Sequence, residues 1–234
     1  MDDRRLMELR VDTDFTHDTR GRMLQSNEPL ETSRSPAPRL FLGCTRAGYV
    51  QRVGAAVPDS LARRLEALVD RHPTSGDIQA PPDVLAALRE TLAKHAPIAT
   101  VGGGPAYRFP DTIRSAGDVV PLTRANRALT QETYPWLSRE VADWQPCFAV
   151  VRDGAAVAVC FSARLSPAAA EAGVDTLPEY RGRGFAATVT AAWGAAIRDT
   201  GRTPLYSTAW DNRASQGVAH SLGLVMFGSD TTWS

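Results

Sequence analysis

The sequence lacks an excess of charge of either sign. Its 234 residues include 26 lysines and arginines and 26 aspartates and glutamates, so the formal net charge at pH 7 is zero. Proteins that bind nucleic acid or anionic membranes need a positive face toward the phosphates. The balanced charge therefore argues against both kinds of partner.

Long apolar runs and cysteine frameworks are also missing. No segment approaches the ~18 apolar residues that a membrane-spanning helix needs. Residues 1–30 mix acidic and basic side chains and have no apolar stretch like that of a signal peptide. Cys44, Cys147 and Cys160 are too few and too irregularly spaced for disulfides or a metal site. We therefore expect a cytoplasmic protein without a metal, with the thiols as small core residues.

The composition, 43% hydrophobic and 22% charged residues, predicts a folded core. No internal repeat is present, and the change of pattern along the chain predicts two regions, residues 1–113 and 114–234. The first is expected to be a smaller α/β region of unknown role. It begins with a charged and polar segment, residues 1–35, in which we predict no helix or strand and which ends in Ser33 to Pro38, a predicted linker or loose loop.

Further along this first region, periodicity predicts two strands within residues 39–57 and helices at 60–70 and 83–95. A short strand is expected at 98–101. The glycines at 102–104 run directly into Pro105 without opening a helix, so we expect a turn there and not a phosphate loop.

The second region has a sharper pattern. A helix is predicted at 126–134, and Asp153-Gly154 predicts a tight hairpin between two strands. The order that follows is strand, helix, strand, helix, strand. The expected ranges are 148–152, 155–163, 171–176, 185–198, 205–210, 214–222 and 224–227, with a loop at 166–170. This order predicts an α/β (α+β) fold with a mixed, mostly antiparallel sheet flanked by helices.

The most informative segment is Val174-Asp-Thr-Leu-Pro-Glu-Tyr-Arg-Gly-Arg-Gly-Phe-Ala186, where a strand passes through a glycine-rich turn directly into a helix. The first turn of a helix has amide N–H groups without partners and carries partial positive charge. Gly182 and Gly184 allow close approach of the backbone, and Arg181 and Arg183 add positive charge. The segment therefore predicts a binding site for a ligand with a pyrophosphate.

Two kinds of pyrophosphate cofactor are compatible with these residues. Gly182-x-Gly184-x-x-Ala187 satisfies the loose dinucleotide fingerprint. However, a hairpin precedes it and too few residues follow to complete a doubly wound sheet. We therefore reject a dinucleotide-binding domain.

The run Arg181-Gly-Arg-Gly-Phe-Ala186 resembles the R/Q-x-x-G-x-G/A signature of the GNAT superfamily of acetyl-CoA-dependent N-acetyltransferases. Downstream, YSTAWDNRASQGVAHSLGL resembles the second cofactor segment of that family. The resemblance covers roughly residues 118–234. It implies the GNAT acyl-CoA N-acyltransferase fold and acetyl-CoA as cosubstrate.

The resemblance also implies residue roles. Backbone amides at the turn would hold the pyrophosphate, the Arg181 side chain would support that loop or the phosphates, and pantetheine would pair with the free edge of the strand 174–176 where it splays from strand 205–210. Asn212 would bond the pantetheine arm or brace the strand end, and Ser215 would reach the cofactor or only cap a helix. The implied cofactor-binding residues are Val174, Asp175, Thr176, Arg181, Gly182, Arg183, Gly184, Phe185, Ala186, Ala187, Asn212 and Ser215.

In this family a primary amine attacks the thioester, which is helped by a base and by a proton for the thiolate. The resemblance makes Glu171 the first candidate base and Asp175 the second; they share a face only if the strand is regular. Many relatives place a tyrosine acid seven residues after the asparagine, where this sequence has Ala219. Tyr206 is a candidate replacement, while His220 points away on a regular helix. Otherwise the thiolate leaves unprotonated or takes its proton from water or the amine.

The acceptor is expected to be an amine of a small molecule or of a protein. Among the aromatic residues, Trp144 and Phe148 are the candidates for contacting it. The N-terminal region could shape the acceptor cleft or mediate a homodimer. Two other functions stay open: a non-catalytic acyl-CoA-binding or sensor protein, prompted by the missing tyrosine, and an interaction protein whose N-terminal region carries the function.

Overall fold

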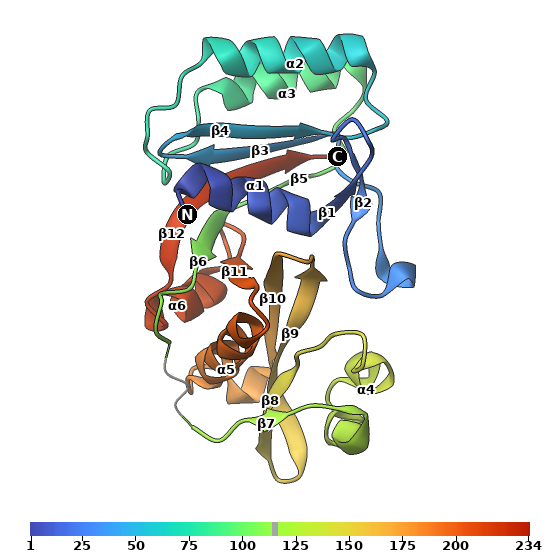
Figure 1. Ribbon diagram of the computed structural model, residues 1–234, viewed down its shortest axis with the longest axis vertical. Coiled ribbons are helices and arrows are strands. Elements are labelled where there is room, and N and C mark those ends of the chain that lie inside the picture. Colours follow the sequence, from blue (N-terminus) through green and yellow to red (C-terminus); the bar gives the residue numbers. More distant parts are fainter. Residues whose placement is uncertain (114–116) are drawn as a thin grey trace.

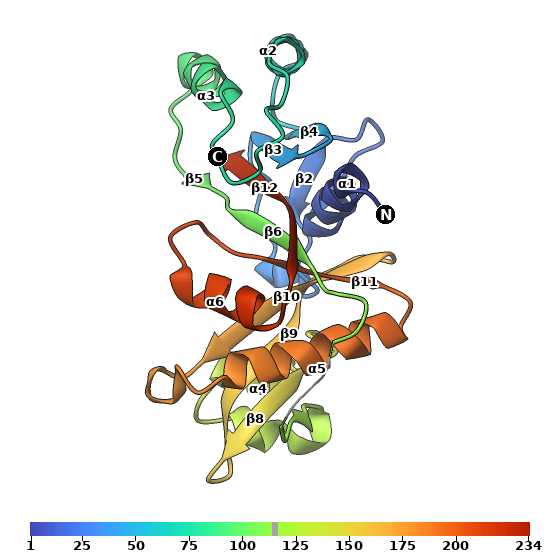
Figure 2. The ribbon, with the colours of Figure 1, turned by 90° about the vertical axis from the view of Figure 1, so that its left-hand side faces the viewer.

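The computed structural model describes residues 1–113 and 117–234 (Figure 1). The second predicted region begins at residue 114, which lies outside the described residues. A sheet of ten strands runs through the molecule, and a separate two-stranded sheet lies near the N-terminus. Helices cover the large sheet on both faces, with α2 and α3 at one end of the molecule and α4 at the other (Figures 1 and 2).

The helices are α1 (Asp3–Asp14), α2 (Asp59–Arg71), α3 (Val84–His95), α4 (Pro135–Glu140), α5 (Phe185–Asp199) and α6 (Arg213–Ser221), with 3-10 turns at Glu31–Ser33, Arg124–Thr130 and Pro178–Tyr180. The strands are β1 (Phe15–His17), β2 (Met23–Ser26), β3 (Leu40–Thr45), β4 (Gly48–Val53), β5 (Val101–Gly102), β6 (Pro105–Arg108), β7 (Val120–Pro121), β8 (Phe148–Arg152), β9 (Ala155–Leu165), β10 (Ala169–Thr176), β11 (Thr203–Ser207) and β12 (Val225–Trp233).

The strand order of the large sheet is β4-β3-β12-β6-β11-β10-β9-β8-β7, with β5 also paired to β12. All neighbours are antiparallel except β10 and β11. The predicted fold class, a mixed and mostly antiparallel sheet flanked by helices, is confirmed. The predicted order of hairpin, strand, helix, strand, helix, strand is also found from β8 to β12.

The two predicted regions share this sheet. The last strand, β12, lies between β3 and β6, and β6 in turn lies between β12 and β11. Strand β6 (residues 105–108) therefore lies in the sheet between β11 and β12, which follow one another along the sequence. The strand predicted at 98–101 is observed instead at Val101–Gly102, and β6 was not predicted, because a four-residue strand after three glycines has no readable alternation.

No helix or strand was predicted in residues 1–35, but the structure has both. They form α1 and the hairpin β1–β2, and α1 buries Leu6, Met7, Leu9 and Val11 against the sheet. The Asp2 side chain caps α1 by accepting a hydrogen bond from the Arg5 amide at 2.8 Å. Charged residues lie between the apolar residues of this helix, and one of the charged residues, Arg10, is buried on the same side. The amphipathic pattern that would predict a helix is therefore not visible in the sequence.

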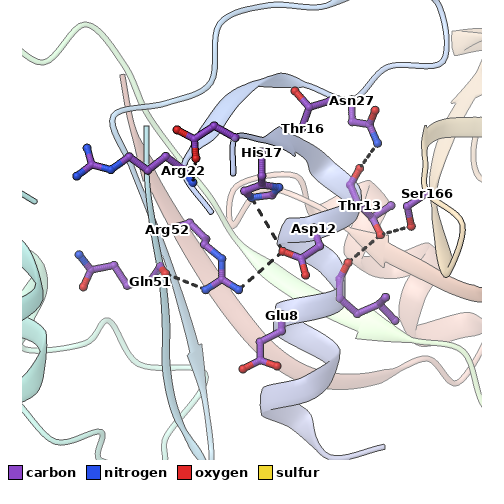
Figure 3. Close-up of polar contacts among 12 residues, drawn as sticks. Glu8, Asp12, Thr13, Thr16, His17, Arg22, Asn27, Gln51, Arg52 and Ser166 are labelled. Atoms are coloured by element: carbon purple, nitrogen blue, oxygen red, sulfur yellow. Dashed lines mark hydrogen bonds and ion pairs between the residues drawn. The ribbon is translucent and has the colours of Figure 1, made fainter. Parts of the chain in front are cut away.

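Polar contacts attach α1 to the turn between β9 and β10 (Figure 3). The Thr13 hydroxyl donates to the Leu9 carbonyl at 2.7 Å and lies 3.0 Å from the Ser166 hydroxyl. The Asn27 amide donates to the carbonyls of Thr13 at 3.1 Å and Leu165 at 2.9 Å. On the outer side of the helix, Asp12 lies 3.8 Å from Arg52 Nη2. The contacts of Thr13 and Asn27 therefore fix α1 relative to the turn that precedes β10, while Asp12 faces β4.

Other sequence expectations also need correction. Residues 126–134, predicted as a helix, contain only part of the 3-10 turn Arg124–Thr130, in which Asn126 is non-helical, and α4 was missed. The loop predicted at 166–170 ends earlier because β10 begins at Ala169, and β11 stops at Ser207, before the predicted residue 210. By contrast, β12 is longer than predicted because β3 and β6 pair with both of its edges.

The three cysteines are buried and unpaired. Burial raises the pKa of Cys147 to about 12, so this thiol is unreactive at neutral pH. Among the described residues, no helix has the length and apolarity that crossing a membrane requires.

We expect Thr13→Val to lower the free energy of unfolding by about 0.5–1.5 kcal/mol, because it removes the contact between the buried Thr13 hydroxyl and the half-buried Ser166 hydroxyl. Chemical denaturation of Thr13→Val, Ser166→Ala and the double variant measures the effect and the coupling between the two hydroxyls. Strictly additive losses would contradict a direct contribution of the Thr13–Ser166 contact.

Candidate functional site

The glycine-rich turn between β10 and α5 leaves a helix N-terminus open. Gly182 and Gly184 adopt left-handed conformations with φ of 73° and 79°, which are strained for other residues. The first hydrogen bond of α5 runs from the Thr188 amide to the Gly184 carbonyl at 3.1 Å. The amides of residues 185–187 therefore have no acceptor within the helix, and together with the helix dipole they form a site for an anion.

Both predicted arginines brace this turn. Arg181 Nε donates to the Thr176 carbonyl at 3.0 Å, and Arg183 Nη2 donates to the Glu179 carbonyl at 3.0 Å. The Arg183 guanidinium also lies over the Tyr180 ring, 5.1 Å from its centroid. Their positive charges remain beside the turn, where they favour a ligand of negative charge.

The strands next to this turn separate. Parallel β10 and β11 pair at three positions, of which the last is Glu171 opposite Leu205. Beyond that point β10 continues to pair with β9 as far as Thr176. Its other edge no longer pairs with β11, so backbone groups of residues 172–176 are available to a ligand that adds to the sheet edge.

A cavity of about 640 Å³ connects the turn, the separated strand and α6. It is lined by twelve residues that the sequence predicted: Val174, Asp175, Thr176, Arg181, Gly182, Gly184, Phe185, Ala186, Ala187, Tyr206, Asn212 and Ser215. The lining residues that were not predicted are Tyr180, Ala214, Gly217, Val218 and Ser221. The last four recur at helical spacing, so the one-face rule for helices could have identified them. Arg183 is not part of the lining.

Helix α6 positions polar groups at the cavity. The Asn212 side chain caps the helix by accepting from the Ser215 amide at 3.1 Å. The Ser215 hydroxyl lies 2.7 Å from the Tyr206 hydroxyl. Burial raises the pKa of Tyr206 to about 12, so this phenol is protonated at neutral pH. Ala219 is packed in the core below, and His220 is exposed and outside the lining.

The two candidate bases lie in different surroundings. Asp175 is exposed, lines the cavity, and accepts from the Thr176 amide at 2.7 Å. Glu171 is only 6% exposed and lies outside the lining of this cavity. Burial, and next the charge of Asp14, raise the pKa of Glu171 to about 7, against an opposing effect of Arg10. Such a carboxyl can gain or lose a proton near neutral pH.

The two candidate acceptor residues are not brought together. Trp144 is buried in a cluster with Trp136 and Phe161, whose ring centroids lie 5.7 and 5.5 Å away. Phe148 packs against a different cluster, the one beneath α5. Neither lines the cavity, and their contact with an acceptor stays a prediction.

No group of three or more metal-binding side chains is found among the described residues. The chemistry of the cavity is that of an open helix N-terminus, two bracing arginines and an unpaired strand edge. These groups fit a cofactor that has a diphosphate at one end and an amide-containing arm at the other.

Comparison with known proteins gives one family. Residues 146–229 match the family model for GNAT acetyltransferases. No curated protein matches the sequence. A solved structure assigned to the GNAT family of acetyltransferases, from Novosphingobium aromaticivorans, is 26% identical, with a TM-score of 0.48 over 58% of this chain and 65% of that one.

Two further solved structures are similar in part. A GCN5-related N-acetyltransferase-like protein from Streptococcus suis is 17% identical, with a TM-score of 0.48 over 86% of this chain and 85% of that one. The aminoglycoside N-acetyltransferase AAC(6')-Iy in complex with CoA is 20% identical, with a TM-score of 0.37 over 47% of this chain and 92% of that one.

The region matched by the family model contains the β8–β9 hairpin, the glycine-rich turn, both helices of the cavity and the unpaired edge of β10. The resemblance of the turn to the GNAT signature is thereby confirmed, and the match supports the predicted class of enzyme, an acyltransferase. Residues 146–229 form a domain of the GNAT acetyltransferase family.

Proposed function

We propose that this protein is an N-acetyltransferase, which transfers an acetyl group from acetyl-CoA to a primary amine of a small molecule or protein by direct attack. The observation that carries the proposal is the cavity in which the glycine-rich turn, the free edge of β10 and α6 meet. In this cavity the glycine-rich turn can bind a diphosphate, and the free edge of β10 can bind an extended arm.

The amides of Phe185, Ala186 and Ala187 would hold the diphosphate, because they have no acceptor within the helix. Val174 to Thr176 would pair with the pantetheine arm, and Ser215 and Asn212 border the same cavity. When bound, the cosubstrate supplies an acyl group on a thioester, whose sulfur is a good leaving group.

In direct attack a carbon–nitrogen bond forms, the carbon–sulfur bond breaks, and the nitrogen loses a proton while the thiolate gains one. Glu171 is the proposed acceptor of the proton, since its pKa of about 7 suits a base at neutral pH. Tyr206 is the proposed donor to the thiolate, because its hydroxyl lines the cavity and is protonated. Tyr206 would then act as the acid in place of the tyrosine that many relatives have at the position of Ala219.

The second candidate function is a non-catalytic acyl-CoA-binding or sensor protein. The core position of Ala219 favours it, because the domain has no acid at the place where many relatives have one. Thiol release from acetyl-CoA with a panel of primary amines separates the two functions. Tight binding of acetyl-CoA without turnover of any amine would favour the sensor.

Gly184→Leu is expected to weaken CoA binding by about tenfold or more, because a side chain at this position projects into the cavity beside the helix N-terminus. Gly201→Leu is the matched control: φ is 79° at Gly184 and 80° at Gly201, and at neither would a Cβ meet an atom within 4 Å. Gly201 does not line the cavity. Calorimetric titration with CoA should show the loss in the first variant alone. Equal losses would mean that backbone strain, and not occupation of the turn, weakens binding.

Tyr206→Phe is expected to lower kcat about 100-fold, because it removes the proposed proton donor. The KM for acetyl-CoA should change little. Tyr107→Phe is the matched control, since this ring packs edge-on against Tyr206 at 6.4 Å but does not line the cavity. Steady-state kinetics with one amine measures both. An unchanged kcat in Tyr206→Phe would exclude its role as acid.

Glu171→Gln tests the proposed base through pH dependence. A base acts when deprotonated, so kcat/KM of the unmodified enzyme should rise as the pH increases through about 7. Glu171→Gln should lower kcat/KM about 100-fold and remove that rise, leaving only the ionisation of the amine. A rise near pH 7 that persists in Glu171→Gln would assign it to another group.

A further inference from the structure

A second cavity, of about 310 Å³, lies on the opposite face of the sheet from the first. Its walls come from both ends of the chain: α1 and β1, β3, the glycines before β6, the end of β11, and β12. In Figure 2, α6 lies to the left of β12 and α1 to its right. The first cavity is lined by α6, and the second by Arg10 and Asp14 of α1.

Both cavities meet the sheet at the same place. Tyr206 lines the first cavity and the next residue, Ser207, lines the second. Successive residues of a strand point to opposite faces, so the two cavities approach β11 from its two sides. The pairing of β10 with β11 ends at Glu171 opposite Leu205, immediately before these residues. The separation of the two strands therefore begins beside both cavities.

The second cavity is acidic. Arg10 Nη1 lies 2.6 Å from Asp230 Oδ1, and Arg10 Nε lies 3.4 Å from Asp14 Oδ2. All three residues line the cavity. One guanidinium thus serves two carboxylates, and the lining has net negative charge when both are ionised.

Glu171 is a third carboxyl on this side. Its neighbour two residues earlier, Ala169, packs in the cluster that contains α1, so Glu171 faces α1 as well. Arg10, Asp14 and Asp230, whose charges act on Glu171, all line the second cavity. Glu171 is 6% exposed and is not itself a lining residue of the second cavity. Among the described residues no group meets hydrogen-bond geometry with either carboxylate oxygen, but the side chain of Ser207, which lines the cavity, is near enough to lower the pKa of Glu171. A buried carboxylate without a partner is costly unless a cation or donor reaches it.

The remaining wall is aromatic. Phe15 and Phe41 line the cavity with their rings edge to face, 6.4 Å between centroids. Aromatic rings accept an aliphatic chain and also attract a cation. A volume of about 310 Å³ lies at the small end of ligand cavities.

We propose that this second cavity is the acceptor site, and that its substrate is a small aliphatic diamine, with one nitrogen at Glu171 and the other, as a cation, near Asp14. When all three carboxyl groups are ionised, they and the one guanidinium have a net charge of two negative units, which the two amino groups of a diamine would balance. The inference rests on the proposed acetyl transfer. It gives the N-terminal region a role: α1 supplies Asp14, which selects the substrate, while Glu171 lies where the pairing of β10 with β11 ends.

The test compares 1,4-diaminobutane with 1-aminopentane, which has the same number of heavy atoms and one charge fewer. We expect kcat/KM with acetyl-CoA to be about tenfold or more higher for the diamine. Asp14→Asn should abolish this preference by raising the KM for the diamine, with the Kd of acetyl-CoA unchanged. Asp12→Asn is the matched control, because Asp12 is on the same helix but is half-exposed and faces Arg52 on the outer side (Figure 3).

A second variant covers the case in which Asp14→Asn does not fold. Ala209 is exposed and lines the cavity, so Ala209→Trp should fill it and raise the KM for the diamine about tenfold or more. Ala47→Trp, at an exposed alanine in the β3–β4 turn, should not. Equal use of the two amines, an unaffected KM in Ala209→Trp, or preference for a lysine peptide would overturn the diamine site. If acetyl-CoA binds and the amines react without these differences, only this inference fails. If acetyl-CoA does not bind, the proposed function fails and this inference with it.

Discussion

The cavity of the glycine-rich turn depends on the separation of β10 from β11, and each of these strands is held on its other edge by a neighbour. β10 stays paired to β9 up to Thr176 opposite Ala158, and β11 stays paired to β6 up to Ser207 opposite Ala106. Each strand therefore has one edge satisfied by its outer neighbour and one edge that faces the gap. Gly104 adds to the constraint, because a Cβ there would lie 1.9 Å from the Thr208 carbonyl. The backbone at Thr208, just after β11, therefore passes so close to residue 104 that only glycine fits there.

The outer support of β11 comes from residues far away in the chain. Strand β6 precedes the GNAT domain, and β12 lies between β6 and β3. The buried ion pair of Arg10 and Asp230 then joins α1 to β12 across 220 positions in sequence. Breaking a buried pair leaves an uncompensated charge, which costs about 3–5 kcal/mol. The N-terminal region is therefore part of the support of the transferase sheet as well as a cover on one of its faces.

The sequence allowed prediction of those parts of the site that depend on local conformation. The turn at Gly182 and Gly184 needs positive φ and a helix start, and both requirements are visible in adjacent residues. Tyr206 and Ser215 were also named, although their contact was not foreseen. The acidic cavity could not be found in this way, because Asp14 and Asp230 lie at opposite ends of the chain and meet only after β12 enters the sheet. Helix α1 was missed for a related reason: Arg10 looks like a surface residue until Asp230 pairs with it.

Glu171 and Tyr206 lie on strands that part at this point, and their environments separate their pKa values, about 7 for the carboxyl and about 12 for the phenol. Pairs of titratable groups that their surroundings drive apart are typical of acid and base partners. Here the carboxyl is on the α1 side of the sheet, near the charged residues of the acidic cavity, and the phenol lines the cavity of the glycine-rich turn. In the proposed transfer the amine is deprotonated on one side of the sheet and the thiolate is protonated on the other. The point where β10 and β11 stop pairing would then lie between the two proton transfers.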